Sequence, residues 1–175
     1  MPIIVVFLIG LGAFGLGMWL FKALVAQAPD EVELKRIEVS PRDEVEALVF
    51  AFERLGYVKV GTFSSGEQPG LTIHGLTHPS GRDGAVHDSD KAGVFAEVVL
   101  WSGEESTVIT SLRELGLPQP PWKTMVHLEG ASIEELHAAS LEHEPTPLDV
   151  VEPHLFAGRV MSDYARTTAW LKANA

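Results

Sequence analysis

Residues 2–28 read PIIVVFLIGLGAFGLGMWLFKALVAQA, and from Ile3 to Phe21 none of them carries a charge. A helix from Ile3 to Ala26 would reach about 36 Å, enough to cross the roughly 30 Å hydrocarbon core of a bilayer. A cleaved signal peptide fits less well, because no lysine or arginine precedes the apolar run. A buried helix of a soluble protein is the other alternative. The stretch predicts a transmembrane anchor over residues 1–28, around which the rest of the fold is expected to be organised.

Small residues recur along one side of this expected helix. Gly10, Ala13 and Gly17 are spaced so that they share a stripe, which would let a second membrane helix approach closely. Trp19 and Lys22 suit the membrane interface, where indole rings and ammonium groups are enriched. We therefore expect the partner to be a membrane protein, either another subunit or a second copy, and the surroundings to be the lipid bilayer.

The basic residues near the anchor indicate which side of the membrane the remaining chain occupies. Lys22, Lys35 and Arg36 all follow the apolar run, and no lysine or arginine precedes it. The positive-inside rule then places residues 29–175 on the cytoplasmic side of a single-pass membrane protein.

Composition limits the possible functions. The chain has 175 residues, no cysteine and a formal net charge of −11 at pH 7. Phosphate backbones would be repelled by such an acidic protein, so we expect no nucleic-acid partner. The absence of cysteine excludes thiolate catalysis and thiolate metal sites.

The rest of the chain divides into a tether with a possible edge strand over residues 29–39 and a soluble α+β domain over residues 40–175. Ser40 is a candidate N-cap for a first helix, and Ser132 with Glu135 forms a capping box for a second. Residues 78–92 are polar and contain proline and glycine, which is typical of a long loop. Period-two alternation or short apolar runs predict strands at residues 57–63, 71–77, 93–101, 106–112 and 123–129. Short turns between them predict an antiparallel sheet of about five strands with flanking helices.

The last expected helix covers residues 154–172 and has one apolar stripe. The stripe consists of Phe156, Val160, Tyr164, Thr167 and Leu171. This spacing is typical of a helix that packs one face against a core.

Seven histidines raise the possibility of a metal site. His74 and His78 are four residues apart, but their neighbours favour a strand, in which four residues span roughly 13 Å. His87 has aspartates near it in the sequence, namely Asp83, Asp88 and Asp90. Neither grouping has the complete spacing of a known site, and no nucleophile motif occurs. The sequence predicts no catalytic, cofactor-binding or metal-ligating residue and no cofactor.

Three functions remain compatible with these features. The first is a non-catalytic accessory or structural subunit of a larger membrane protein complex, because the strongest signal in the chain is an anchor with a small-residue stripe. The second is a membrane-tethered ligand-binding or sensory domain, with residues 78–92 as a mobile wall. The third is a hydrolase-like enzyme whose site is formed by residues distant in sequence.

Overall fold

A seven-stranded sheet forms the centre of the fold. The structure, a computed structural model, describes residue 26 and residues 28–90, 92–114, 116 and 118–174. The strands lie in the sheet in sequence order, as β1 (Leu34–Ile37), β2 (Val58–Ser65), β3 (Leu71–His78), β4 (Arg82–Ser89), β5 (Gly93–Ser102), β6 (Glu105–Thr110) and β7 (Lys123–His127). The helices are α2 (Asp43–Arg54), α3 (Ile133–Glu142), the short 3-10 helix η2 (Pro153–Leu155) and α4 (Phe156–Asn174).

The sheet is mixed. Strands β1 to β6 pair antiparallel with their neighbours, whereas β7 runs parallel to β6. The prediction of an antiparallel sheet of about five strands is therefore wrong, because the sheet has seven strands and β7 pairs parallel to β6. Lys123, the first residue of β7, lies opposite Ser106 near the start of β6, so the connection between the two strands has to return along the length of β6. Three prolines within residues 118–121 keep this return segment out of the sheet, since proline cannot donate a ladder hydrogen bond.

Residues 78–92 are not a loop, as the sequence suggested, but contain the whole of β4. The turn before β4 is tight, with Gly81 at a φ of +87° and its N–H donating to the His78 carbonyl at 3.0 Å. The sequence of β4 does not show the usual alternation of apolar and polar residues, because polar side chains of this strand are buried. Asp83 and His87 are buried on one face of the sheet, while Val86 joins the core on the other.

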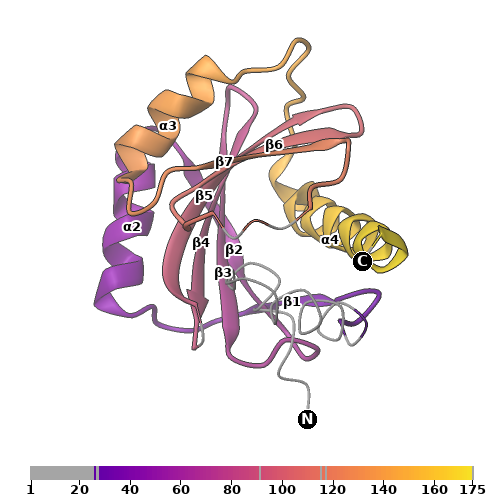
Figure 1. The fold of residues 1–175 in the computed structure, drawn as a ribbon. Helices are drawn as coiled ribbons and strands as arrows, with labels where there is room; N and C mark the ends of the chain where they lie inside the picture. The colour runs from indigo at the N-terminus through magenta and orange to yellow at the C-terminus, as the bar shows by residue number, and fades with distance from the viewer. Residues whose placement is uncertain (1–25, 27, 91, 115, 117, 175) are drawn as a thin grey trace.

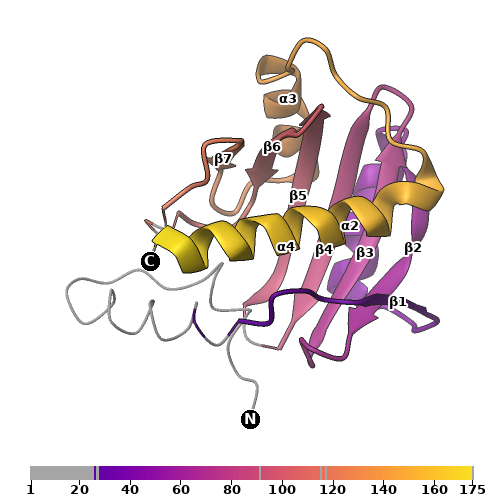
Figure 2. The same ribbon diagram turned by 90° about the vertical axis from the view of Figure 1, so that its right-hand side faces the viewer.

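Two layers of helix cover the sheet. Helices α2 and α3 lie on one face, and α4 crosses the opposite face, as Figures 1 and 2 show from two sides. Gly84 permits close packing on the first face, because a Cβ atom there would lie 3.0 Å from the ring of Phe52. The core on this face includes Val45, Phe52, Leu76, Val98, Ile109 and Leu136.

Helix α4 contacts the sheet closely at its N-terminal end. A Cβ atom at Gly75 would lie 2.4 Å from the ring of Phe156, so only glycine leaves room for this aromatic side chain. Phe156 stacks on Phe63 of β2, with ring centroids 5.9 Å apart. Ile73 and Ala85 complete this second, smaller core. Further along α4, residues of the helix and the sheet line a cavity.

The helix-capping predictions had different outcomes. The capping box at the start of α3 is confirmed, with Ser132 accepting from the Glu135 N–H and the Glu135 carboxylate accepting from the Ser132 N–H. Ser40 is not the N-cap of α2, which begins at Asp43 with Arg42 in the capping position and no side-chain cap. The expected edge strand is present as β1.

The predicted anchor over residues 1–28 falls outside the described residues, apart from residues 26 and 28. Among the described residues, no helix is both long and apolar enough to cross a bilayer. The assignment as a single-pass transmembrane protein is therefore corrected, because it depended on hydropathy of the sequence and no described helix supports it. The five residues given roles in that assignment, Gly10, Ala13, Gly17, Trp19 and Lys22, all lie outside the described residues.

Candidate functional site

A cavity of about 220 Å³ lies between α4 and the sheet. Side chains alternate between the two faces of a strand, so the sheet contributes every second residue to the cavity wall. Strands β3 to β5 and β7 provide Leu71, Ile73, Asp83, Ala85, His87, Phe95, Glu97, Val99, Trp101, Lys123 and Met125. Helix α4 provides Phe156, Val160, Asp163, Tyr164, Thr167, Thr168 and Leu171, which include the whole apolar stripe predicted for this helix. Most of the wall is apolar, and its carboxyl, ammonium and imidazole groups occur in three polar sets.

The first polar set is a histidine–carboxylate pair. His87 Nε2 lies 3.0 Å from Glu97 Oε2, and the His87 ring stacks on Phe95 with centroids 4.5 Å apart. Burial would raise the pKa of Glu97, but the charge of His87 and its hydrogen bond, together with Lys123, hold it below the usual value. Glu97 therefore stays ionised inside the protein, and Phe95 and Glu97 fix the orientation of the imidazole.

The second polar set is an ion pair that joins α4 to the sheet. Lys123 Nζ of β7 lies 2.5 Å from Asp163 Oδ2 of α4, and both side chains are mostly buried. Ser106 Oγ donates to the other carboxylate oxygen at 3.5 Å. The charge of Lys123 is therefore balanced by the charge of Asp163.

The third polar set contains a buried carboxyl group. Asp83 is only 3% exposed, and Trp101 Nε1 donates a hydrogen bond to its Oδ2 at 3.0 Å. Burial raises the pKa of Asp83 to about 7, although the Trp101 hydrogen bond and the charge of Arg159 act in the opposite direction. Arg159 lies 5.2 Å from the centre of the Trp101 ring and pairs with Asp149 at 3.2 Å.

The segment that precedes β1 is attached to the middle and to the C-terminal end of α4. The hydroxyl of Tyr164 donates to the Pro29 carbonyl at 3.3 Å. Lys172 Nζ donates to the Ala28 carbonyl at 2.6 Å and to Asp30 Oδ1 at 2.7 Å. Burial raises the pKa of Tyr164, which stays a neutral donor. These contacts hold the helix that covers the cavity.

Another group of titratable residues lies on the opposite side of the sheet. Tyr57 OH lies 3.1 Å from His137 Nδ1, and its ring is 4.9 Å from that of His78. Nearby, Arg82 is 3% exposed and bonds Ser140 Oγ from Nε at 3.0 Å. Burial, followed by the charge of Arg82, lowers the pKa of both histidines. Within the described part of the chain, no group of three or more histidines and carboxylates could hold a metal ion.

The structure separates the histidine groupings considered from the sequence. His74 bonds Thr62 at 3.1 Å and is not near His78 as a chelating pair. His87 pairs with Glu97 instead of an aspartate, while Asp88 pairs with Arg42.

Sequence reasoning missed all three polar sets of the cavity. One signal was present for Glu97, which is the sole charged residue within the apolar strand at residues 93–101. For Asp83 the signal was hidden by the assignment of residues 78–92 to a loop. No sequence feature linked Lys123 to Asp163, which are 40 residues apart.

Comparison of this chain with protein-family models, curated proteins and solved structures gives no match.

Proposed function

We propose that this protein binds a small, mainly apolar organic molecule in the cavity between α4 and the sheet. The observation that carries the proposal is a cavity with apolar walls and a few buried polar groups at fixed positions. This combination is typical of small-molecule sites, where apolar contact supplies affinity and polar groups fix orientation. The volume of about 220 Å³ suits a ligand smaller than a typical drug molecule.

The other functions considered from the sequence have less support. The accessory-subunit hypothesis depended on Gly10, Ala13 and Gly17, which lie outside the described residues. The hydrolase hypothesis needs a nucleophile beside a base. His87 contacts Glu97 and Phe95, and neither provides the hydroxyl nucleophile of a serine-type hydrolase. Ligand binding needs no such group.

The proposal is tested by filling the cavity. Val99 lines the cavity, whereas Val58 of β2 is 61% exposed. Val99→Phe places an aromatic ring in the cavity, and Val58→Phe makes the same change on the surface. Ligand-observed NMR with neutral aromatic fragments, from benzene to naphthalene, would measure binding to each protein.

We expect at least one fragment to bind the wild-type protein and Val58→Phe equally, and binding to be lost in Val99→Phe. A wild-type protein that binds none of the fragments would contradict the proposal. Equal binding to folded Val99→Phe would also contradict it, because the fragment would then occupy another place.

A further inference from the structure

The charged groups in the cavity wall do not balance. The wall contains three carboxyl groups, from Asp83, Glu97 and Asp163, against Lys123 and His87. Glu97 is paired with His87, and Asp163 with Lys123. Among the described residues, Asp83 has no ion-pair partner. The carboxyl group of this wall without an ion-pair partner is therefore Asp83, which carries a negative charge when it is ionised and is influenced by the nearby charge of Arg159.

Among the described residues, Trp101 is the one side chain that donates a hydrogen bond to the Asp83 carboxylate, so its second oxygen can accept from a ligand. Trp101 occupies one carboxylate oxygen, Oδ2, and the side chain lines the cavity. Arg159 does not occupy the other oxygen, because its guanidinium pairs with Asp149 and lies over the Trp101 ring. A buried carboxylate is unfavourable without a cation, and a bound ammonium group would remove this cost.

The remaining wall suits the body of such a ligand. Trp101 lines the cavity beside Asp83 and adds ring surface to the wall, while Arg159 lies over this ring. Phe95, Phe156 and Val160 provide apolar contacts for a hydrocarbon body. An anionic ligand would need a free cation, but Lys123 is already paired with Asp163.

We infer that the ligand of this cavity is a small organic ammonium ion, with its nitrogen bound to Asp83 and its apolar body between α4 and the sheet. The inference rests on the proposed function, and it specifies the charge class of the ligand.

Three probes of nearly equal size and different charge test this inference: 2-phenylethylamine, 2-phenylethanol and phenylacetate. Their dissociation constants are measured by calorimetry or ligand-observed NMR at pH 8, where the Asp83 carboxyl is largely ionised. A charged hydrogen bond exceeds a neutral one in strength, so the amine is expected to bind about tenfold more tightly than the alcohol. Phenylacetate is expected to bind most weakly.

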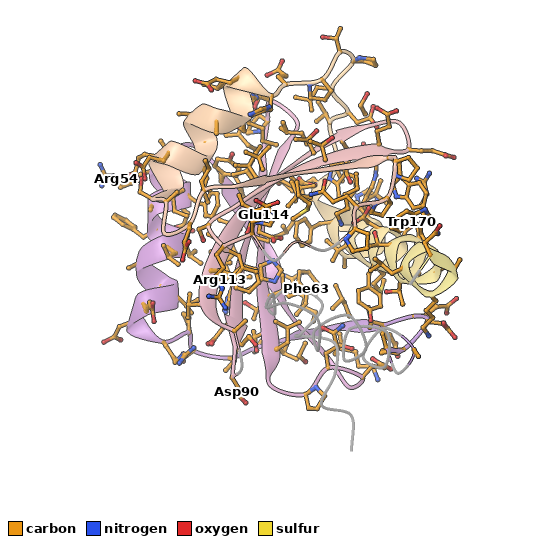
Figure 3. All side chains as sticks on the ribbon, viewed as in Figure 1. Arg54, Phe63, Asp90, Arg113, Glu114 and Trp170 are labelled. Carbon is orange, nitrogen blue, oxygen red and sulfur yellow. The ribbon has the colours of Figure 1, made fainter. Side chains whose placement is uncertain are left out.

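Asp83→Asn tests the residue, because asparagine can still accept from Trp101 but has no charge. We expect the variant to bind the amine and the alcohol about equally. Asp90→Asn is the matched control, since Asp90 is exposed at the β4–β5 turn, away from α4 (Figure 3). It is expected to keep the wild-type preference for the amine.

The outcomes separate this inference from the proposed function. If the alcohol binds as tightly as the amine, or Asp83→Asn keeps the preference, the assignment of charge is wrong and the cavity remains a binding site. If none of the probes binds, both are wrong. The comparison of probes within the wild-type protein needs no variant, so it decides the inference even if Asp83→Asn does not fold.

Discussion

Asp83 links protonation to stability through a single buried carboxyl group. Its pKa in the folded protein is about 7, against an ordinary value of 3.8, because burial disfavours the charged form. The folded state therefore holds this proton more strongly than the unfolded state. The resulting stability is fully present below about pH 4 and is lost as pH rises through about 7.

Replacing Asp83 with asparagine is expected to remove this loss. Between pH 5 and pH 8, the free energy of unfolding of Asp83→Asn should increase relative to wild type by about 2–3 kcal/mol. Urea denaturation at pH 5, 6.5 and 8 would measure the difference, with Asp90→Asn as the surface control. A difference between Asp83→Asn and wild type that does not change with pH would contradict the assignment.

The histidines near Tyr57 are expected to make the protein less stable as the pH falls, which is the opposite of the effect of Asp83. Burial and the charge of Arg82 lower the pKa of His137, so the unfolded state binds this proton more strongly. The neutral form of His137 contributes to the stability of the folded state at pH values above about 6.5, the pKa of histidine in the unfolded chain. This contribution is lost as the pH falls below that value. His137→Gln should therefore reduce the loss of stability between pH 7 and pH 5.

The expected change for His137→Gln is below about 1 kcal/mol, because this side chain is partly exposed to solvent. Urea denaturation at pH 5 and pH 7 would measure it. His154→Gln is the control, since His154 is about 70% exposed and far along the chain in η2. Equal acid sensitivity of His137→Gln and wild type would contradict the expected role of burial.

At the scale of secondary structure, the position of α4 depends on a glycine. A methyl group at Gly75 would lie 2.4 Å from the Phe156 ring, so Gly75→Ala forces the helix or the ring to move. We expect a loss of about 1–3 kcal/mol in the free energy of unfolding, as for other overpacked sites, and weaker binding of cavity probes.

Gly66→Ala is the matched control, because a Cβ atom at Gly66 would have no neighbour within 4 Å. Urea denaturation and probe binding of the two variants test the prediction together. Equal stability of Gly75→Ala and Gly66→Ala would show that Phe156 adjusts without cost.

Elements governed by local rules were predictable from the sequence. The capping box at Ser132 determined the start of α3, and the apolar stripe of α4 faces the cavity as its spacing indicated. Strand β4 was not predictable, because the pattern rule assumes that polar residues face solvent, whereas Asp83 and His87 face a buried cavity. The parallel pairing of β7 depends on the path of residues 111–122, which hydropathy does not encode.

At the scale of the whole molecule, the candidate site is assembled from residues distant in sequence. Trp101 reaches Asp83 across 18 residues, and Lys123 reaches Asp163 across 40. Each residue is unremarkable in its own segment, so motif analysis could not group them. The prediction that dominated the sequence analysis, an anchor over residues 1–28, falls outside the described residues except for residues 26 and 28, and no described helix is able to span a membrane.

The attachment of residues 28–30 to α4 is also a property of the whole molecule. Lys172→Met keeps the aliphatic chain and removes the donor to Ala28 and Asp30. We expect faster amide hydrogen exchange in both residues 28–34 and the C-terminal half of α4, because the two segments hold each other. Arg54→Met, at an exposed position in α2 (Figure 3), is the control. Faster exchange in only one segment would contradict their coupling.

The contact between Lys172 and Asp30 closes a loop of 142 residues, and it therefore bears on the order of folding. Contacts between neighbouring strands close short loops at little entropic cost, whereas this one requires most of the chain to be in place. The hairpins of the sheet can thus form before α4 is secured. Ligand affinity should be acquired in the last folding phase, after the sheet, and a ligand should slow unfolding by stabilising the contacts that form last.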